Sequence, residues 1–123
     1  MRISGDRYYT PIPIYEWLQS KLELSEQRIF DPCCGQDHPT ETVFGLNNEV
    51  WENDIDIEVG TASSFDARIQ LIWETLPSID WVITNPPYTQ PPLDEIIRNS
   101  LEYSDVGVAM LLRLSYLEPC PNR

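Results

Sequence analysis

The stretch Trp81-Val82-Ile83-Thr84-Asn85-Pro86-Pro87-Tyr88 joins a short apolar run to an amide, two prolines and an aromatic ring. The apolar run, residues 81–84, predicts a buried strand over 80–84. Both prolines have a fixed φ and no N–H, and the residue before a proline is pushed out of the helical region. The loop after the strand is therefore stiff, with main-chain carbonyls left without local donors. Such a loop can accept hydrogen bonds from an –NH₂ group and stack an aromatic face on its ring.

Around this stretch, strand-like and helix-like segments alternate along the chain. Helices are expected over 11–24, 39–46, 67–76 and 93–103, and strands over 28–31, 49–53, 80–84 and 107–112. A further, very short strand is expected within 58–65. Alternation of this kind predicts an α/β fold with a mostly parallel sheet. The length of 123 residues fits one domain, 1–123.

Helical spacing also predicts which side chains face the core. The first helix is expected to bury Ile14, Trp17, Leu18 and Leu22, and the last helix Leu93, Ile96, Ile97 and Leu101. The four tryptophans, Trp17, Trp51, Trp73 and Trp81, fall at core-like positions, which favours a packing role over a stacking platform.

Charge restricts the partners that this chain can hold by itself. The formal net charge is −12, from 20 acidic and 8 basic residues, and the basic residues are scattered. Because nucleic-acid binding draws affinity from Lys and Arg, any DNA contacts are expected from another segment or chain. A protein partner is the other possibility for this acidic surface.

Several sequence features bear on the compartment. No apolar run approaches the ~20 residues of a membrane span, so no membrane association is expected. The polar start, residues 1–6, lacks the apolar core of a signal peptide. Three cysteines, two of them adjacent, do not form a disulfide framework. A cytoplasmic location is therefore expected.

Candidate functional residues follow the predicted strands directly. Asp31 follows the first strand, Asp54 the second, and Asn85 the strand over 80–84. Ligands of open parallel sheets bind at the carboxyl ends of the strands. These three side chains are therefore expected to share one site.

Five segments, in this order, carry a family resemblance: Tyr8-Tyr9-Thr10-Pro11, Phe30-Asp31-Pro32-Cys33-Cys34-Gly35, Asn53-Asp54-Ile55-Asp56, Asn85-Pro86-Pro87-Tyr88 and the tail 111–119. Together they resemble the amino-methyltransferases that use S-adenosylmethionine, above all the phage-type DNA N6-adenine methyltransferases. The resemblance implies a Rossmann-like class I methyltransferase sheet. The last strands of the full fold and a target-recognition region are expected to be missing, so the domain is expected to be incomplete at its C-terminus.

The resemblance implies a set of cofactor-binding residues, which comprises Tyr9, Thr10, Asp31, Pro32, Gly35, Asp54 and Asp66. In this reading Asp31 receives the amino group of the methionine part, directly or through water. Asp54 accepts hydrogen bonds from the ribose hydroxyls, with Asp56 as the alternative. Asp66 takes the amino group of the cofactor's adenine. The sequence departs from the family at the second glycine of the loop, where Asp37 stands.

The resemblance also implies that Asn85, Pro86, Pro87 and Tyr88 form the catalytic loop. The Asn85 side-chain oxygen and the Pro86 carbonyl would each accept one N–H of the target amine, and Tyr88 would stack on the flipped base. Catalysis would then consist of positioning and electrostatics, with no strong base. The resemblance also bears on the target base. An asparagine at position 85 favours adenine, whereas a serine there would favour cytosine.

Other interpretations stay open at this stage. The chain could be a degenerate remnant that keeps the fold but methylates nothing, or an amino-methyltransferase that acts on protein glutamine or RNA. A zinc set of Cys33, Cys34, His38 and Cys120 does not match the spacing of zinc fingers or ribbons. No metal is therefore expected.

Overall fold

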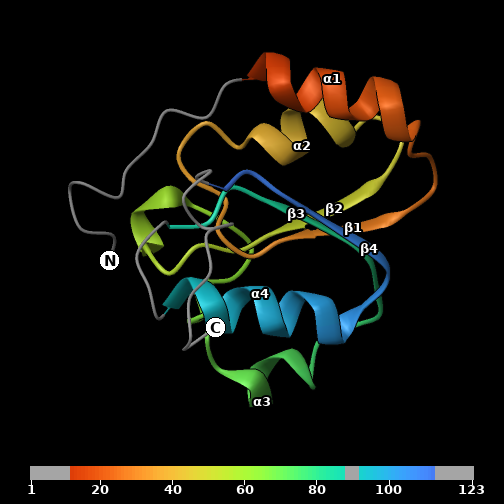
Figure 1. Ribbon diagram of the computed structural model, residues 1–123. Helices are drawn as coiled ribbons and strands as arrows, with labels where there is room; N and C mark the ends of the chain where they lie inside the picture. The colour runs from red at the N-terminus through yellow and green to blue at the C-terminus, as the bar shows by residue number, and fades with distance from the viewer. Residues whose placement is uncertain (1–11, 88–91, 113–123) are drawn as a thin grey trace.

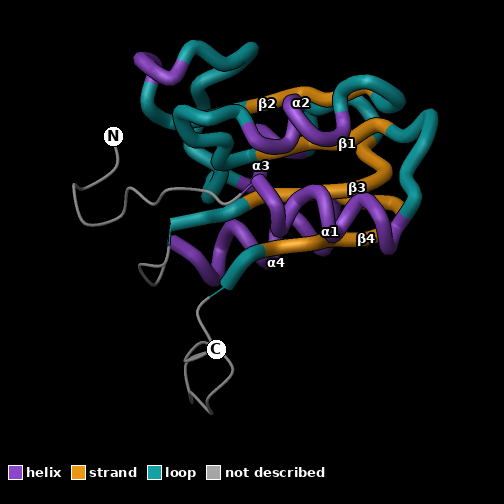
Figure 2. The backbone as a smooth tube through the Cα atoms, turned by 90° about the horizontal axis from the view of Figure 1, so that it is seen from above, coloured by secondary structure: helices purple, strands orange, loops and turns teal. Residues whose placement is uncertain are grey.

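The computed structural model describes residues 12–87 and 92–112 of the chain. One four-stranded sheet runs in the order β2-β1-β3-β4, and every pairing in it is parallel (Figure 2). Its strands are β1 (Arg28–Asp31), β2 (Glu49–Glu52), β3 (Ile79–Thr84) and β4 (Ser104–Met110). The helices are α1 (Ile12–Leu22), α2 (Pro39–Phe44), α3 (Gln70–Trp73) and α4 (Pro92–Tyr103). The predicted α/β class and parallel sheet are confirmed.

Helices cover both faces of the sheet, with α1 and α2 on one side and α3 and α4 on the other (Figure 1). Because side chains alternate along a strand, neighbouring residues feed opposite cores. Ile29 of β1 packs with Tyr15 and Phe44 under α1 and α2. Phe30, the next residue, packs with Trp73 on the face covered by α3 and α4. Both faces of the sheet are thus buried, as parallel sheets require.

The prediction of a very short strand within residues 58–65 is wrong. The chain forms a 3₁₀ turn over Ile57–Val59 and one isolated bridge between Asn53 and Ser63. Asp56 caps the turn by accepting from the Glu58 N–H (3.0 Å), and Gly60 ends it with φ +77°. An acid placed to cap and a glycine at positive φ favour a turn over an extended segment.

Three of the predicted core positions are also wrong. Ile14 is 43% exposed, Trp17 is 59% exposed and Leu101 is 63% exposed. In α1, Tyr15 takes the buried position and turns Trp17 outward. In α4, Asn99 faces inward because its Nδ2 donates to the Ala67 carbonyl oxygen (3.0 Å). A buried polar anchor of this type is invisible to a hydrophobic pattern.

None of the helices in the described part of the chain combines the length and apolar character needed to cross a bilayer.

Close approach of β3 and β4 depends on Gly107, which pairs with Trp81. A Cβ at Gly107 would lie 2.8 Å from Cζ3 of Trp81. We therefore expect Gly107→Val to lower the free energy of unfolding by about 1–3 kcal/mol through overpacking. Urea unfolding measures this. The neighbouring Val106→Thr, at a 61% exposed position, should stay within about 0.5 kcal/mol of the wild type. Equal effects of the two changes would contradict the steric argument.

Candidate functional site

The predicted site residues meet at the carboxyl edge of the sheet, where three strands end. β1 ends at Asp31 beside Glu52 of β2, and β3 ends at Thr84, one residue before Asn85. The chain passes from β1 to β2 on one side and returns to β3 on the other, so the strand order reverses between β1 and β3. The place between these two strands is the topological switch point of the sheet. Open α/β sheets bind ligands at such a point.

Asp31 joins the two sides of this switch point through its fully buried carboxylate. Its Oδ1 accepts from the Thr84 hydroxyl (2.5 Å) and from the Cys33 N–H (3.1 Å), and its Oδ2 accepts from the Thr40 hydroxyl (2.7 Å). One side chain therefore fixes the end of β3, the loop after β1 and the start of α2. The sequence predicted Asp31 but gave no sign of either threonine.

Burial raises the pKa of Asp31 to about 7, although the hydrogen bonds from Thr84, Thr40 and Cys33 oppose this shift. The protonated Asp31 carboxyl group also has an acceptor for its proton. Thr40 can turn its hydroxyl toward the Ile83 carbonyl oxygen (3.4 Å) and then accept from Asp31. Asp31 is thus set to exchange a proton near neutral pH.

The loop after β1 is held to the segment after β2 by paired hydrogen bonds. Asn53 Nδ2 donates to the Pro32 carbonyl oxygen (2.9 Å), and the Cys34 N–H donates to the Asn53 carbonyl oxygen (2.9 Å). The Gly35 N–H donates to Asp54 Oδ2 (2.9 Å). Gly35 has φ +78°, and a Cβ there would meet no heavy atom within 4 Å. The loop backbone therefore borders open space, as close approach of a ligand requires.

Asp54 is almost fully buried, and both its carboxylate oxygens accept backbone N–H groups, from Gly35 and from Asp56 (2.9 Å each). Asp56 accepts in turn from Glu58. Asp54 is thus a buried acceptor that links the loop after β1 to the segment after β2. Asn53, which the sequence did not single out, is the hub beside it, because its side chain also bonds Ser63 and Phe65.

Asp66 lies further along the chain and makes an ion pair with Arg68 (2.6 Å). The Arg68 guanidinium holds the pKa of Asp66 below its usual range. Asp66 is therefore a charged acceptor in a local turn, and no hydrogen bond of the described residues ties it to Asp31 or Asp54.

In the loop that was predicted to be catalytic, Asn85 and Pro86 are buried and Pro87 is partly buried. Asn85 follows Thr84 directly, so the bond between Thr84 and Asp31 fixes where this loop leaves the sheet. Tyr88, Tyr9 and Thr10 lie outside the described residues.

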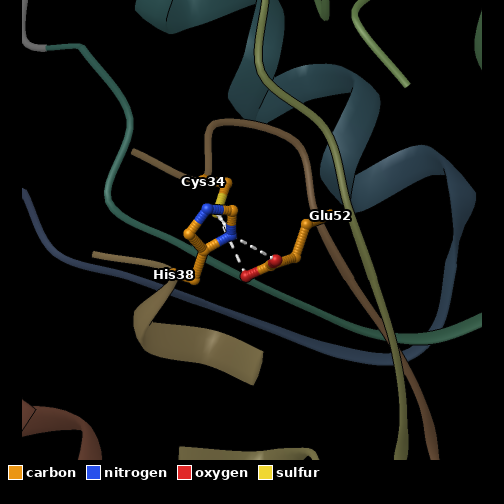
Figure 3. Close-up of side chains that lie close together, drawn as sticks. All are labelled: Cys34, His38 and Glu52. Atoms are coloured by element: carbon orange, nitrogen blue, oxygen red, sulfur yellow. Dashed lines mark hydrogen bonds and ion pairs between the residues drawn. The ribbon is translucent and has the colours of Figure 1, made fainter. Parts of the chain in front are cut away.

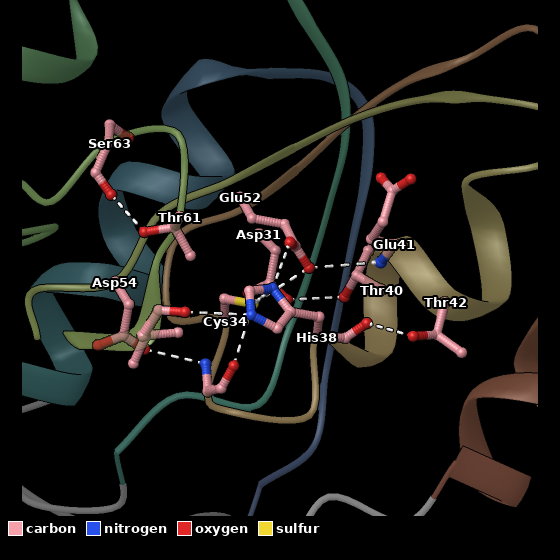
Figure 4. A network of polar contacts seen from close by, with 12 residues as sticks. Asp31, Cys34, His38, Thr40, Glu41, Thr42, Glu52, Asp54, Thr61 and Ser63 are labelled. Carbon is pink, nitrogen blue, oxygen red and sulfur yellow. Dashed lines mark hydrogen bonds and ion pairs between the residues drawn. The ribbon is translucent and has the colours of Figure 1, made fainter. Parts of the chain in front are cut away.

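A polar cluster that the sequence did not predict lies beside the loop after β1 (Figure 4). It consists of Cys34, His38 and Glu52, and Glu52 Oε1 lies 2.7 Å from His38 Nδ1. Hydrogen bonding to Glu52 raises the pKa of His38. The sequence alone does not identify Glu52 as a member of this cluster. Its place follows only from the register of β1 and β2, which pairs Glu52 with Asp31.

The raised pKa of Asp31 predicts a specific pH dependence of stability. The folded protein binds this proton up to about pH 7, and the unfolded chain only up to about pH 4. The contribution of Asp31 to the free energy of unfolding is therefore fully present below pH 4 and is lost as pH rises through 7. Between these values the free energy of unfolding falls by up to about 1.4 kcal/mol per pH unit. Urea unfolding from pH 4 to 8 measures the slope.

Asp31→Asn should remove this slope, because a neutral amide replaces the protonated acid. Thr40→Val should extend the fall to higher pH, because one hydrogen bond to the anion is lost. Identical slopes in the wild type and Asp31→Asn would show that Asp31 does not titrate in this range.

Comparison with known proteins gives the fold. No family model and no curated protein matches the chain. One similar solved structure is precorrin 8W decarboxylase from Methanobacterium thermoautotrophicum, with TM-score 0.67 and 14% identity, covering 94% of this chain and 71% of that one. Another is the E. cuniculi Mtq2–Trm112 complex responsible for methylation of the translation termination factor eRF1, with TM-score 0.57 and 23% identity, covering 87% and 74%. The chain therefore has the Rossmann-like fold of these proteins, and at these identities the likeness extends to the fold alone.

Proposed function

We propose that this chain binds S-adenosylmethionine and transfers its methyl group to a planar –NH₂ group, the N6 amine of adenine in DNA. One observation carries the proposal. The hydrogen bond between Thr84 and Asp31 ties the start of the Asn85-Pro86-Pro87 loop to the loop that contains Gly35, at the switch point of the sheet. The groups suited to the amine and the groups suited to the cofactor thus share one edge.

The residues present fit this cofactor by their chemistry. Gly35 offers backbone beside open space, and Asp54 is a carboxylate, the type of acceptor suited to the ribose hydroxyls, bonded to the same glycine. Asp31 offers carboxyl oxygens toward the methionine amino group, and because it is fully buried, a bridging water fits this role better than direct contact. Asp66, Pro32, Tyr9 and Thr10 complete the proposed set. The cofactor itself supplies a methyl group bound to a positive sulfur.

For the target, Asn85 and Pro86 offer two acceptors fixed by the following proline ring. Accepting both N–H groups of an amine favours a pyramidal nitrogen with its lone pair free to attack. No described residue has to act as a base, so the rate gain comes from orientation and fixed dipoles. Pro87 keeps the backbone of the loop rigid, and Tyr88 is proposed to stack on the target ring.

A second candidate is methylation of a glutamine amide in a protein partner. The net charge of −12 opposes binding to phosphates and suits a basic protein surface. The solved Mtq2–Trm112 complex, responsible for methylation of eRF1, has the same fold. The Asn85 loop could accept an amide –NH₂ in the same way.

Calorimetry with S-adenosylmethionine, followed by transfer of a labelled methyl group, tests the proposal. We expect micromolar binding by the wild type, weakened about tenfold or more in Asp54→Asn, because a charge-assisted hydrogen bond is lost. Asn85→Ala should keep the cofactor affinity but lower the transfer rate by about 10²–10³-fold. The exposed Glu102→Gln should match the wild type in both assays.

Duplex DNA with adenine and a glutamine peptide serve as parallel methyl acceptors. Label in adenine supports the DNA reaction, and label in the peptide alone moves the assignment to the second candidate. A folded chain that does not bind the cofactor would overturn the proposal and leave a remnant of the fold.

A further inference from the structure

Three metal-ligating side chains converge beside the cofactor loop (Figure 3). Cys34 Sγ lies 3.4 Å from His38 Nδ1 and 3.1 Å from Glu52 Oε2, and His38 Nδ1 lies 2.7 Å from Glu52 Oε1. They come from the β1–α2 loop, from the residue before α2 and from the end of β2. Residues distant in sequence are thus brought to one point by the fold.

We propose that Cys34, His38 and Glu52 bind a single Zn²⁺ ion, a site separate from the methyl-transfer function. Thiolate, imidazole and carboxylate are the ligand types of zinc in proteins, and a thiolate disfavours Mg²⁺ and Ca²⁺. Three protein ligands leave a fourth position for water. The His38 side chain is 33% exposed, so solvent reaches this position.

The second nitrogen of His38 supports this assignment independently. Nε2 lies 3.2 Å from the Val59 carbonyl oxygen, which can only accept the Nε2–H, so Nδ1 is the ring nitrogen that faces Cys34 and Glu52. Metal-binding histidines almost always donate their other N–H to a carbonyl or carboxylate in this way. Glu52 is oriented as well, because its Oε2 accepts from the Glu41 N–H (3.4 Å).

The distances require only a small adjustment. Tetrahedral zinc with ordinary bond lengths holds such ligand atoms about 3.4–3.6 Å apart. The sulfur–nitrogen distance is already 3.4 Å. The Glu52 carboxylate must withdraw by roughly 0.5 Å, which its side-chain torsions allow without backbone movement.

Charge favours a cation over a cysteine nucleophile at this place. Cys34 is 2% exposed, and its Sγ lies 3.1 Å from the Glu52 carboxylate. A buried thiol beside a carboxylate is a poor nucleophile. A bound divalent cation offsets the nearby carboxylates and deprotonates the thiol. The protons of Cys34 and of His38 Nδ1 leave to solvent as the sulfur–metal and nitrogen–metal bonds form.

Titration of the metal-free, reduced protein with Co²⁺ tests the site, because Co²⁺ replaces zinc and reports its ligands by absorption. We expect one equivalent to bind, with the visible bands of a tetrahedral ion and a thiolate-to-metal charge-transfer band. Zn²⁺ should displace Co²⁺ and abolish the bands. The affinity should fall with decreasing pH, because protons compete for the ligands.

The adjacent cysteines provide a matched pair of variants. Cys34→Ser should remove the charge-transfer band, whereas Cys33→Ala should keep it, because the Cys33 side chain packs in the core on α3 and α4. His38→Gln and Glu52→Gln should lower the affinity for Co²⁺ by about 10-fold or more, with wild-type circular dichroism as the check on folding. Octahedral bands without charge transfer, or a spectrum unchanged in Cys34→Ser, would overturn the proposal. Neither readout depends on S-adenosylmethionine.

Discussion

The buried carboxylate of Asp31 is the interaction on which the functional edge depends. A charge without solvent is costly unless it is hydrogen-bonded, and here two threonine hydroxyls and one backbone N–H supply the bonds. The neutral acid is favoured up to about pH 7, so the protein buries a carboxyl group that it can keep uncharged. The ends of β1 and β3 and the start of α2 therefore meet at fixed separations, and removing the carboxylate would leave the two hydroxyls with only long bonds of 3.4 Å to backbone carbonyls.

Preorganisation of the proposed site follows from this anchor. Thr84 is fixed by Asp31, and Pro86 and Pro87 restrict the backbone just beyond it, so the segment 85–87 has little conformational freedom. On the other side, the Asn53 side chain fastens the loop after β1 to the end of β2, and no buried side-chain nitrogen or oxygen of the described residues is left unpaired. Fixed dipoles of this kind stabilise a transition state without reorganising during the reaction.

The sequence predicted the fold and the positions of Asp31, Asp54 and Asn85, because both depend on local patterns: apolar strands and the polar residues that end them. Thr40, Thr84 and Glu52 could not be predicted, because a threonine or glutamate is ordinary in a sequence and gains its role from strand register. The buried Asn99 and the exposed Trp17 were misjudged for a related reason. Hydrophobic periodicity does not weigh a buried hydrogen bond against an apolar contact.

The distribution of acids at this edge explains why both proposals involve cations. Asp31, Glu52 and Asp54 all act on the Cys34 thiol, and His38 is the basic side chain that contacts this group. Such a concentration of carboxylates raises the free energy of the folded state. Binding of a cation, whether the sulfonium and amino groups of the proposed cofactor or the proposed metal ion, would relieve this repulsion and stabilise the fold by mass action. Both proposals therefore predict that the folded chain is more stable with its ligand than without it.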